Sequence, residues 1–136
     1  MNHIEFQELE RKRVLKLYSQ KKHAAFGSKK LLADWFCKKL KEQRAKCYYC
    51  NTSIHDINRL IDAGKLRTRK VRNAGVRGKS LEIDKINNKD GYGDTNNVLA
   101  CYYCNNDKSY TIDGADYKKH FGQNREKYHQ FLLDQL

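Results

Sequence analysis

The sequence has few hydrophobic residues and no long apolar stretch. Hydrophobic residues make up 39% of the 136 positions, so part of the stability must come from something other than apolar burial. No run approaches the roughly 20 apolar residues of a membrane span. The N-terminal segment MNHIEFQELERKR lacks the apolar centre of an export signal. We therefore expect a cytoplasmic protein with no membrane partner.

Acidic residues are scarce relative to basic ones. The chain has 16 Asp and Glu against 28 Lys and Arg, which gives a net charge of +12. Such an excess favours a polyanionic partner, because each phosphate that a Lys or Arg neutralises releases condensed counterions. Solubility alone, or attraction to an anionic membrane, is the alternative explanation. We expect a nucleic acid.

The positive charge is concentrated in residues 65–79, KLRTRKVRNAGVRGK, which include no acidic residue. Two glycines in this segment predict a flexible loop rather than a packed helix. Such a loop would follow phosphates, and its arginines are candidates for groove contacts, since arginine is the commonest reader of base edges. The candidate nucleic-acid-binding residues are Lys65, Arg67, Arg69, Lys70, Arg72, Arg77 and Lys79.

The length and the apolar periodicity predict one α+β domain over residues 1–136. Residues 1–46 are expected to form N-terminal helices, residues 47–110 a central core, and residues 111–136 C-terminal helices. The individual elements predicted are helices over 3–20 and 29–43, with Ser28 as N-cap, a short helix within 51–64, strands over 80–86 and 97–103, a short helix from 105, and helices over 113–121 and 124–135, separated by Gly122.

The tetrapeptide CYYC occurs twice, at Cys47–Cys50 and at Cys101–Cys104. A two-residue spacing lets one turn direct both sulfurs at one ion, so two such turns supply the four thiolates of a closed structural zinc site. Buried cysteines or a redox dithiol are the alternatives, but the βαβ context of a redox motif is absent. Zinc would contribute much of the folding free energy in so polar a chain. Cys37 has no partner at this spacing and is expected to be a free structural thiol.

Between the two cysteine pairs, LEIDKI and GYGDTNNVLACYYCNNDK resemble the HNH nucleases. The core of that family is a ββα-metal motif, a strand, loop, strand and helix around one divalent cation. The resemblance implies a zinc-braced HNH core with flanking helices and a metal-dependent DNA endonuclease. It makes Asp84 and Asn105 the ligands of Mg²⁺ or Mn²⁺, and Asn97 the residue that steadies the loop and the base. One carboxylate and one amide oxygen suit a hard cation and leave positions for water and phosphate.

The sequence departs from the HNH pattern at Lys85, where the family has its general base histidine. A lysine is mostly protonated at neutral pH and does not readily take a proton from water. One rare-cutting restriction endonuclease of the family also has a basic residue here. The resemblance to it implies that His23 is the base, Tyr92 a nucleophile or proton relay, and Lys85 a phosphate clamp; His55 is a reserve base.

Three functions follow from this pattern. The first is a DNA endonuclease, which would need a homodimer or two visits to cut both strands of a duplex. The second is a zinc-braced nucleic-acid-binding module that has lost its catalytic base, which Lys85 favours. The third is an RNA-cleaving enzyme on the same scaffold.

Overall fold

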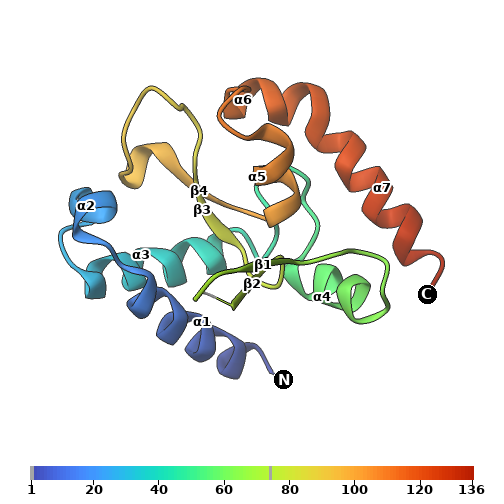
Figure 1. The fold of residues 1–136 in the computed structure, drawn as a ribbon, viewed down its shortest axis with the longest axis horizontal. Coiled ribbons are helices and arrows are strands. Elements are labelled where there is room, and N and C mark those ends of the chain that lie inside the picture. Colours follow the sequence, from blue (N-terminus) through green and yellow to red (C-terminus); the bar gives the residue numbers. More distant parts are fainter. Residues whose placement is uncertain (1, 74) are drawn as a thin grey trace.

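Two helices at the N-terminal end of the chain lie side by side. In the computed structural model, which describes residues 2–73 and 75–136, α1 (His3–Leu17) packs against α3 (Lys29–Glu42) (Figure 1). Ser28 caps α3 as predicted, because its hydroxyl accepts a hydrogen bond from the Leu31 N–H. The first predicted helix is too long: α1 ends at Leu17, and a separate turn, α2 (Gln20–His23), follows.

The two central strands form an antiparallel hairpin. β3 (Glu82–Lys85) pairs with β4 (Asn97–Ala100), with Asp84 opposite Val98 and Lys85 opposite Asn97. The strand predicted over 97–103 is wrong at its end, since α5 (Tyr102–Lys108) begins there. The Cys101 sulfur caps α5 by accepting the Cys104 N–H at 3.3 Å, so the second cysteine pair opens a helix instead of extending a strand.

The basic segment is partly ordered as a second hairpin. After α4 (Ile54–Asp62), β1 (Arg69–Val71) pairs with β2 (Gly75–Arg77). The prediction of a loop throughout residues 65–79 is therefore wrong for these two strands. We call residues 65–79 the basic ribbon. Gly75 lies in the left-handed region at φ +78°, which a glycine adopts without steric cost and which helps the chain to turn.

The C-terminal helices are continuous instead of separated. α6 (Gly114–Tyr117) runs through a π-helical turn, Lys118–Gly122, into α7 (Gln123–Leu133). Gly122 was predicted as a stop, but it serves close packing: a Cβ atom there would collide with the backbone carbonyl of Tyr49.

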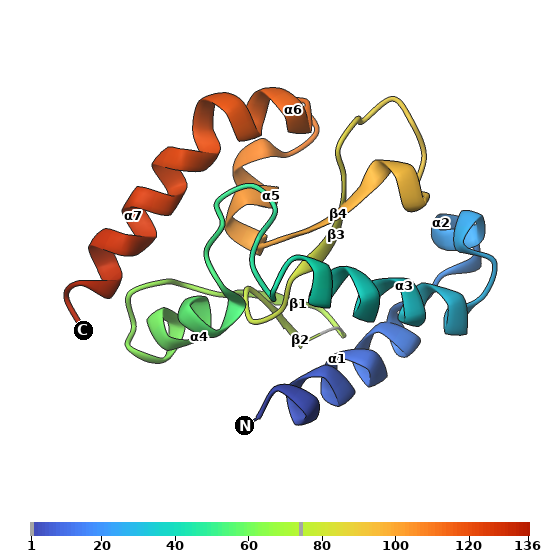
Figure 2. The same ribbon diagram turned by 180° about the vertical axis from the view of Figure 1, so that it is seen from behind.

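A single hydrophobic cluster includes Val14, Phe36, Leu99 and Leu132 and so draws on all parts of the chain. The hairpin β3–β4 lies between the pair α1–α3 on one side and α5 with α7 on the other, in both views (Figures 1 and 2). Cys37 is buried in this core as a free thiol. Within residues 2–73 and 75–136, no helix combines the length and the apolar character needed to cross a membrane.

Candidate functional site

The four paired cysteines converge at one point. The sulfurs of Cys47, Cys50, Cys101 and Cys104 are buried and all lie within 4.8 Å of one another, and those of Cys50 and Cys101 are 3.9 Å apart. A tetrahedral zinc with Zn–S bonds of about 2.3 Å separates its sulfurs by roughly 3.8 Å. The four thiols therefore fit the geometry of a structural zinc site.

The electrostatics of this cluster also suit a cation. Hydrogen bonds from Cys101, Cys104 and Cys47 lower the pKa of Cys50, whereas burial raises the pKa of Cys101. Four thiolates at this separation repel one another unless a cation lies among them. The first cysteine pair is joined to the hairpin, since the Tyr48 N–H donates to the Leu99 carbonyl at 2.9 Å.

Helix α7 contributes a histidine that borders the cysteine cluster. His129 is fully buried, and its Nδ1 lies 2.9 Å from the Thr52 hydroxyl and 3.8 Å from the Cys50 sulfur. Residues that contact metal ligands orient them and tune their basicity. No motif in the sequence indicates His129, because only the fold brings it close to a cysteine almost eighty positions earlier.

Asp84, the predicted carboxylate ligand, lies on β3 beside the first cysteine pair. Its Oδ2 accepts a hydrogen bond of 2.6 Å from the Tyr49 hydroxyl and lies 3.5 Å from the Lys108 ammonium. Burial raises the pKa of Asp84, although Tyr49 and Lys108 oppose the shift. Tyr49 stands between the two cysteines of its pair, so the carboxylate is fixed directly to the cysteine cluster.

Asn105, the predicted amide ligand, lies on α5 directly after Cys104. Its Nδ2 donates to Glu82 Oε1 at 2.9 Å. Glu82 and Asp84 are two positions apart on β3 and face the same side of the strand. Asn105 and Lys108 are three apart on α5 and share one face of the helix. The contacts of Asn105 with Glu82 and of Lys108 with Asp84 thus bring the facing sides of β3 and α5 together.

Asn97 connects the loop between β3 and β4 to strand β3. Its Nδ2 donates to the Asp84 carbonyl at 2.9 Å, and its Oδ1 accepts the Gly93 N–H at 2.6 Å. Asn96, which the sequence analysis did not single out, donates to the carbonyls of Asn87, Asp90 and Gly91. The amides of Asn96 and Asn97 hold the loop between β3 and β4 in one conformation.

The structure brings His23, Lys85 and Tyr92 together. The rings of His23 and Tyr92 meet edge to face with centroids 5.5 Å apart, and the ammonium groups of Lys85 and Lys22 each lie 5.1 Å from the centre of the Tyr92 ring. Successive strand residues point to opposite faces, and the contacts agree: Lys85 lies against the Tyr92 ring, whereas Asp84 lies against Lys108 of α5. His55 is apart from this group, with its ring against Phe6.

The hydrogen bond that His23 accepts determines which tautomer its neutral ring adopts. Its Nδ1 accepts the Ser19 N–H at 3.0 Å, so the neutral imidazole carries its proton on Nε2. Burial, with a smaller effect of Lys22, lowers the pKa of His23. In this arrangement Nε2 is a donor, and action as a base requires Nδ1 to give up the bond from Ser19.

Most of the basic ribbon faces solvent. Lys65, Arg67, Arg69, Lys70, Arg72 and Lys79 are exposed. Arg77 differs, because its guanidinium donates to both oxygens of Glu82, at 2.6 and 2.9 Å, and lies over the Tyr102 ring. The ribbon is fixed to the second cysteine pair by the Tyr103 hydroxyl, which donates to the Arg67 carbonyl at 2.8 Å.

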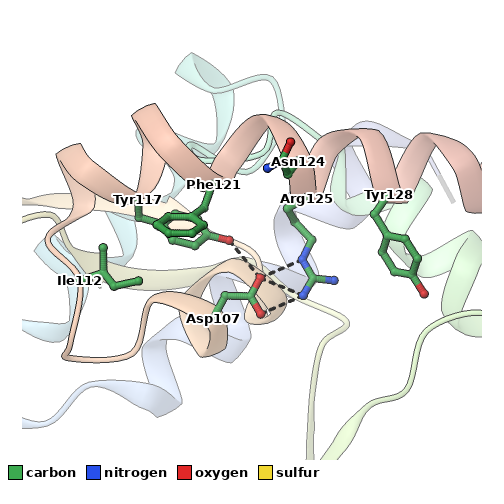
Figure 3. Close-up of a pocket in the computed structure, with 7 residues that line it drawn as sticks. All are labelled: Asp107, Ile112, Tyr117, Phe121, Asn124, Arg125 and Tyr128. Carbon is green, nitrogen blue, oxygen red and sulfur yellow. Dashed lines mark hydrogen bonds and ion pairs between the residues drawn. The ribbon is translucent and has the colours of Figure 1, made fainter.

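A pocket of about 390 Å³ lies between α5 and the C-terminal helices. In Figure 3, Asp107 lies between the Tyr117 hydroxyl and the Arg125 guanidinium, both of which point toward it. The two charged groups are paired with each other, and the remaining lining is largely aromatic. We assign this contact to the attachment of α7 to α5.

The strand, loop and strand between two converging cysteine pairs, together with helix α5, which carries the last cysteine, define an α+β fold of the HNH type. A comparison with solved structures agrees: the rare-cutting HNH restriction endonuclease PacI has a similar fold, with a TM-score of 0.62 over 90% of this chain and 78% of that chain. The two sequences are 22% identical, so the likeness shows the fold and not the activity. No protein-family model and no curated protein sequence matches the chain.

Proposed function

We propose that this protein is a metal-dependent DNA endonuclease that hydrolyses phosphodiester bonds. The observation that carries the proposal is the arrangement of Asp84 and Asn105 on the facing sides of β3 and α5, beside the four-cysteine cluster. In the HNH pattern these two positions hold the catalytic cation. The likeness to PacI, which its description calls a restriction endonuclease, supports the same conclusion.

Two metals are implied, and the residues suit both. The four thiolates would hold a structural Zn²⁺. The Asp84 carboxylate and the Asn105 amide oxygen would hold Mg²⁺ or Mn²⁺, which prefer oxygen ligands. A divalent cation there would supply the positive charge that stabilises the scissile phosphate as negative charge develops. Tyr49 holds Asp84 in place and Asn97 holds the loop, so both parts of the site are preorganised.

The group of His23, Lys85 and Tyr92 is our candidate for activating the nucleophile and holding phosphate. Lys85 would bind a phosphate oxygen, and Tyr92 would act as nucleophile or proton relay. His23 would donate from Nε2 in the observed arrangement and accept a proton at Nδ1 once the Ser19 bond is broken. The exposed residues of the basic ribbon would contact the DNA backbone.

An inactive nucleic-acid-binding module is the second candidate. It is favoured by Lys85 in the position of the family's base and by the occupied Nδ1 of His23. Cleavage of RNA by the same site is a third possibility that the nuclease assay distinguishes, and a homodimer is the expected form if both strands of a duplex are cut.

Incubation of the zinc-loaded protein with supercoiled plasmid and Mg²⁺ or Mn²⁺ tests the proposal. We expect nicked or linear DNA that is lost without the divalent cation and in a double variant, Asp84→Asn with Lys108→Met. Salt-sensitive binding without cleavage would favour the inactive module, and cleavage of RNA alone would favour a ribonuclease. Sequencing of the product ends would define the target.

A further inference from the structure

The orientation of the Asn105 amide is fixed by its neighbour. A carboxylate can only accept hydrogen bonds, so the group that Asn105 presents to Glu82 must be its NH₂. The bond is 2.9 Å long. The Oδ1 atom then points away from Glu82, and this oxygen is the one that can bind a cation.

Glu82 is itself held on both oxygens. Arg77 donates from Nη2 to Oε1 at 2.6 Å and from Nε to Oε2 at 2.9 Å. Such paired bonds between guanidinium and carboxylate fix both groups in a common plane. The Arg77 guanidinium also lies 4.8 Å from the centre of the Tyr102 ring on α5. Glu82 therefore has a defined position, and its oxygens are already occupied.

We propose that Glu82 is a positioning residue that turns the oxygen of Asn105 toward the catalytic cation, with Arg77 holding Glu82 in place. This inference rests on the proposed function, because it concerns the same metal site. Arg77, which the sequence predicts to contact nucleic acid, would instead connect the basic ribbon to a candidate metal ligand through Glu82. Without Glu82 the amide could rotate and present its NH₂, which cannot bind a cation.

The test compares the loss of Glu82 in two backgrounds. Mn²⁺ binding to zinc-loaded protein is measured by calorimetry for the wild type, Glu82→Ala, Asn105→Asp and the combined variant. A carboxylate at position 105 offers an oxygen in either orientation and repels Glu82. We expect Glu82→Ala to weaken Mn²⁺ binding about 10- to 100-fold with Asn105 present. In the Asn105→Asp background, Glu82→Ala should leave the Mn²⁺ affinity unchanged or increase it.

Two controls separate positioning from folding. Glu126 accepts an amide hydrogen bond from Asn51, next to a structural cysteine, and not from a candidate cation ligand, so Glu126→Ala should leave Mn²⁺ affinity unchanged. Glu82→Gln keeps an acceptor oxygen at the position of Oε1. Its Mn²⁺ affinity should therefore stay within about threefold of the wild type, a much smaller loss than the one expected for Glu82→Ala. If Glu82→Ala does not fold, a large loss of Mn²⁺ affinity in Glu82→Gln would still overturn the positioning role, because that variant keeps the acceptor oxygen.

The outcomes are distinguishable. Equal losses in both backgrounds, or no loss in either, would overturn the positioning role while leaving the nuclease proposal intact. A wild-type protein that does not bind Mn²⁺ at all would overturn the proposed function, and the role of Glu82 with it.

Discussion

The pair of Asp84 and Lys108 makes a specific prediction about stability. Lys108 is fully buried, and among residues 2–73 and 75–136 its ammonium has one acidic partner, the Asp84 carboxylate at 3.5 Å. Asp84→Asn, which removes the carboxylate charge, leaves this cation buried without a counter-charge. Removing one partner of a buried ion pair costs about 3–5 kcal/mol. For a chain of this length that loss lowers Tm by roughly 10–25 °C.

Removing both charges should restore most of the stability. In the double variant Asp84→Asn, Lys108→Met, the amide oxygen can still accept the hydrogen bond from Tyr49 and the methionine fills the space of the lysine chain. Replacing a buried ion pair by neutral groups is often neutral, so we expect the double variant to unfold within about 1 kcal/mol of the wild type. Urea unfolding of zinc-loaded protein in buffer free of Mg²⁺ measures all three proteins.

The loss of stability caused by Asp84→Asn should also depend on pH. Burial raises the pKa of Asp84 above 3.8, so the folded state holds this proton more tightly than the unfolded chain does. Above the raised pKa the carboxylate is charged and balances Lys108. Between that pKa and 3.8 the folded wild type binds a proton that the unfolded chain does not, which stabilises it relative to the non-titrating Asp84→Asn variant, so the penalty grows as the pH falls through this range. A double variant as unstable as Asp84→Asn, at every pH, would refute the pairing.

Three further predictions concern packing, zinc and DNA. Gly122→Ala should destabilise the protein by about 2 kcal/mol or more in thermal unfolding, because the new methyl group meets the Tyr49 carbonyl. Gly91 has open space around it, so Gly91→Ala should change thermal unfolding little. Stripping zinc with a strong chelator should unfold the domain, as followed by circular dichroism; a stable metal-free protein would contradict the zinc assignment. Arg69→Ala should reduce the slope of log affinity against log salt by about 1 and weaken binding to all sequences alike.

The elements set by local sequence could be predicted. Two-residue spacing between cysteines, a Ser before an amphipathic stretch and alternating apolar residues each act over a few positions. The convergence of the four cysteines, the start of α3 and the hairpin β3–β4 therefore follow from the sequence. The boundary at Cys101 could not be placed, because residues 98–103 form one continuous apolar run in the sequence, and only the structure shows the cysteine sulfur capping a helix.

The residues around the candidate ligands were largely missed. Glu82 is two positions from Asp84 and Lys108 is three from Asn105, so strand and helix periodicity would have placed each beside its neighbour. No periodicity indicates Tyr49, which meets Asp84 across 35 positions. Its contact depends on how the first cysteine pair packs on the hairpin, and a single sequence does not encode that arrangement in any short pattern.

The two copies of the CYYC motif contact different parts of the protein through their tyrosines. The second tyrosine of each copy reaches outward: the Tyr49 hydroxyl donates to Asp84, and the Tyr103 hydroxyl donates to the Arg67 carbonyl of the basic ribbon. The same four-cysteine cluster thus anchors the candidate metal ligand through one turn and the candidate DNA-binding segment through the other.

These two anchors should be separable by mutation. Tyr49→Phe removes a hydrogen bond to a carboxylate, so it should weaken Mn²⁺ binding and leave DNA affinity measured without divalent cation unchanged. Tyr103→Phe frees the ribbon backbone, so it should weaken DNA binding and leave Mn²⁺ affinity unchanged. Loss of a buried hydrogen bond costs about 1–3 kcal/mol, and retention of zinc in both variants would show that the cysteine cluster is intact. If each variant impaired both kinds of binding equally, the two turns would not act independently, and the tyrosines would serve only to stabilise the fold.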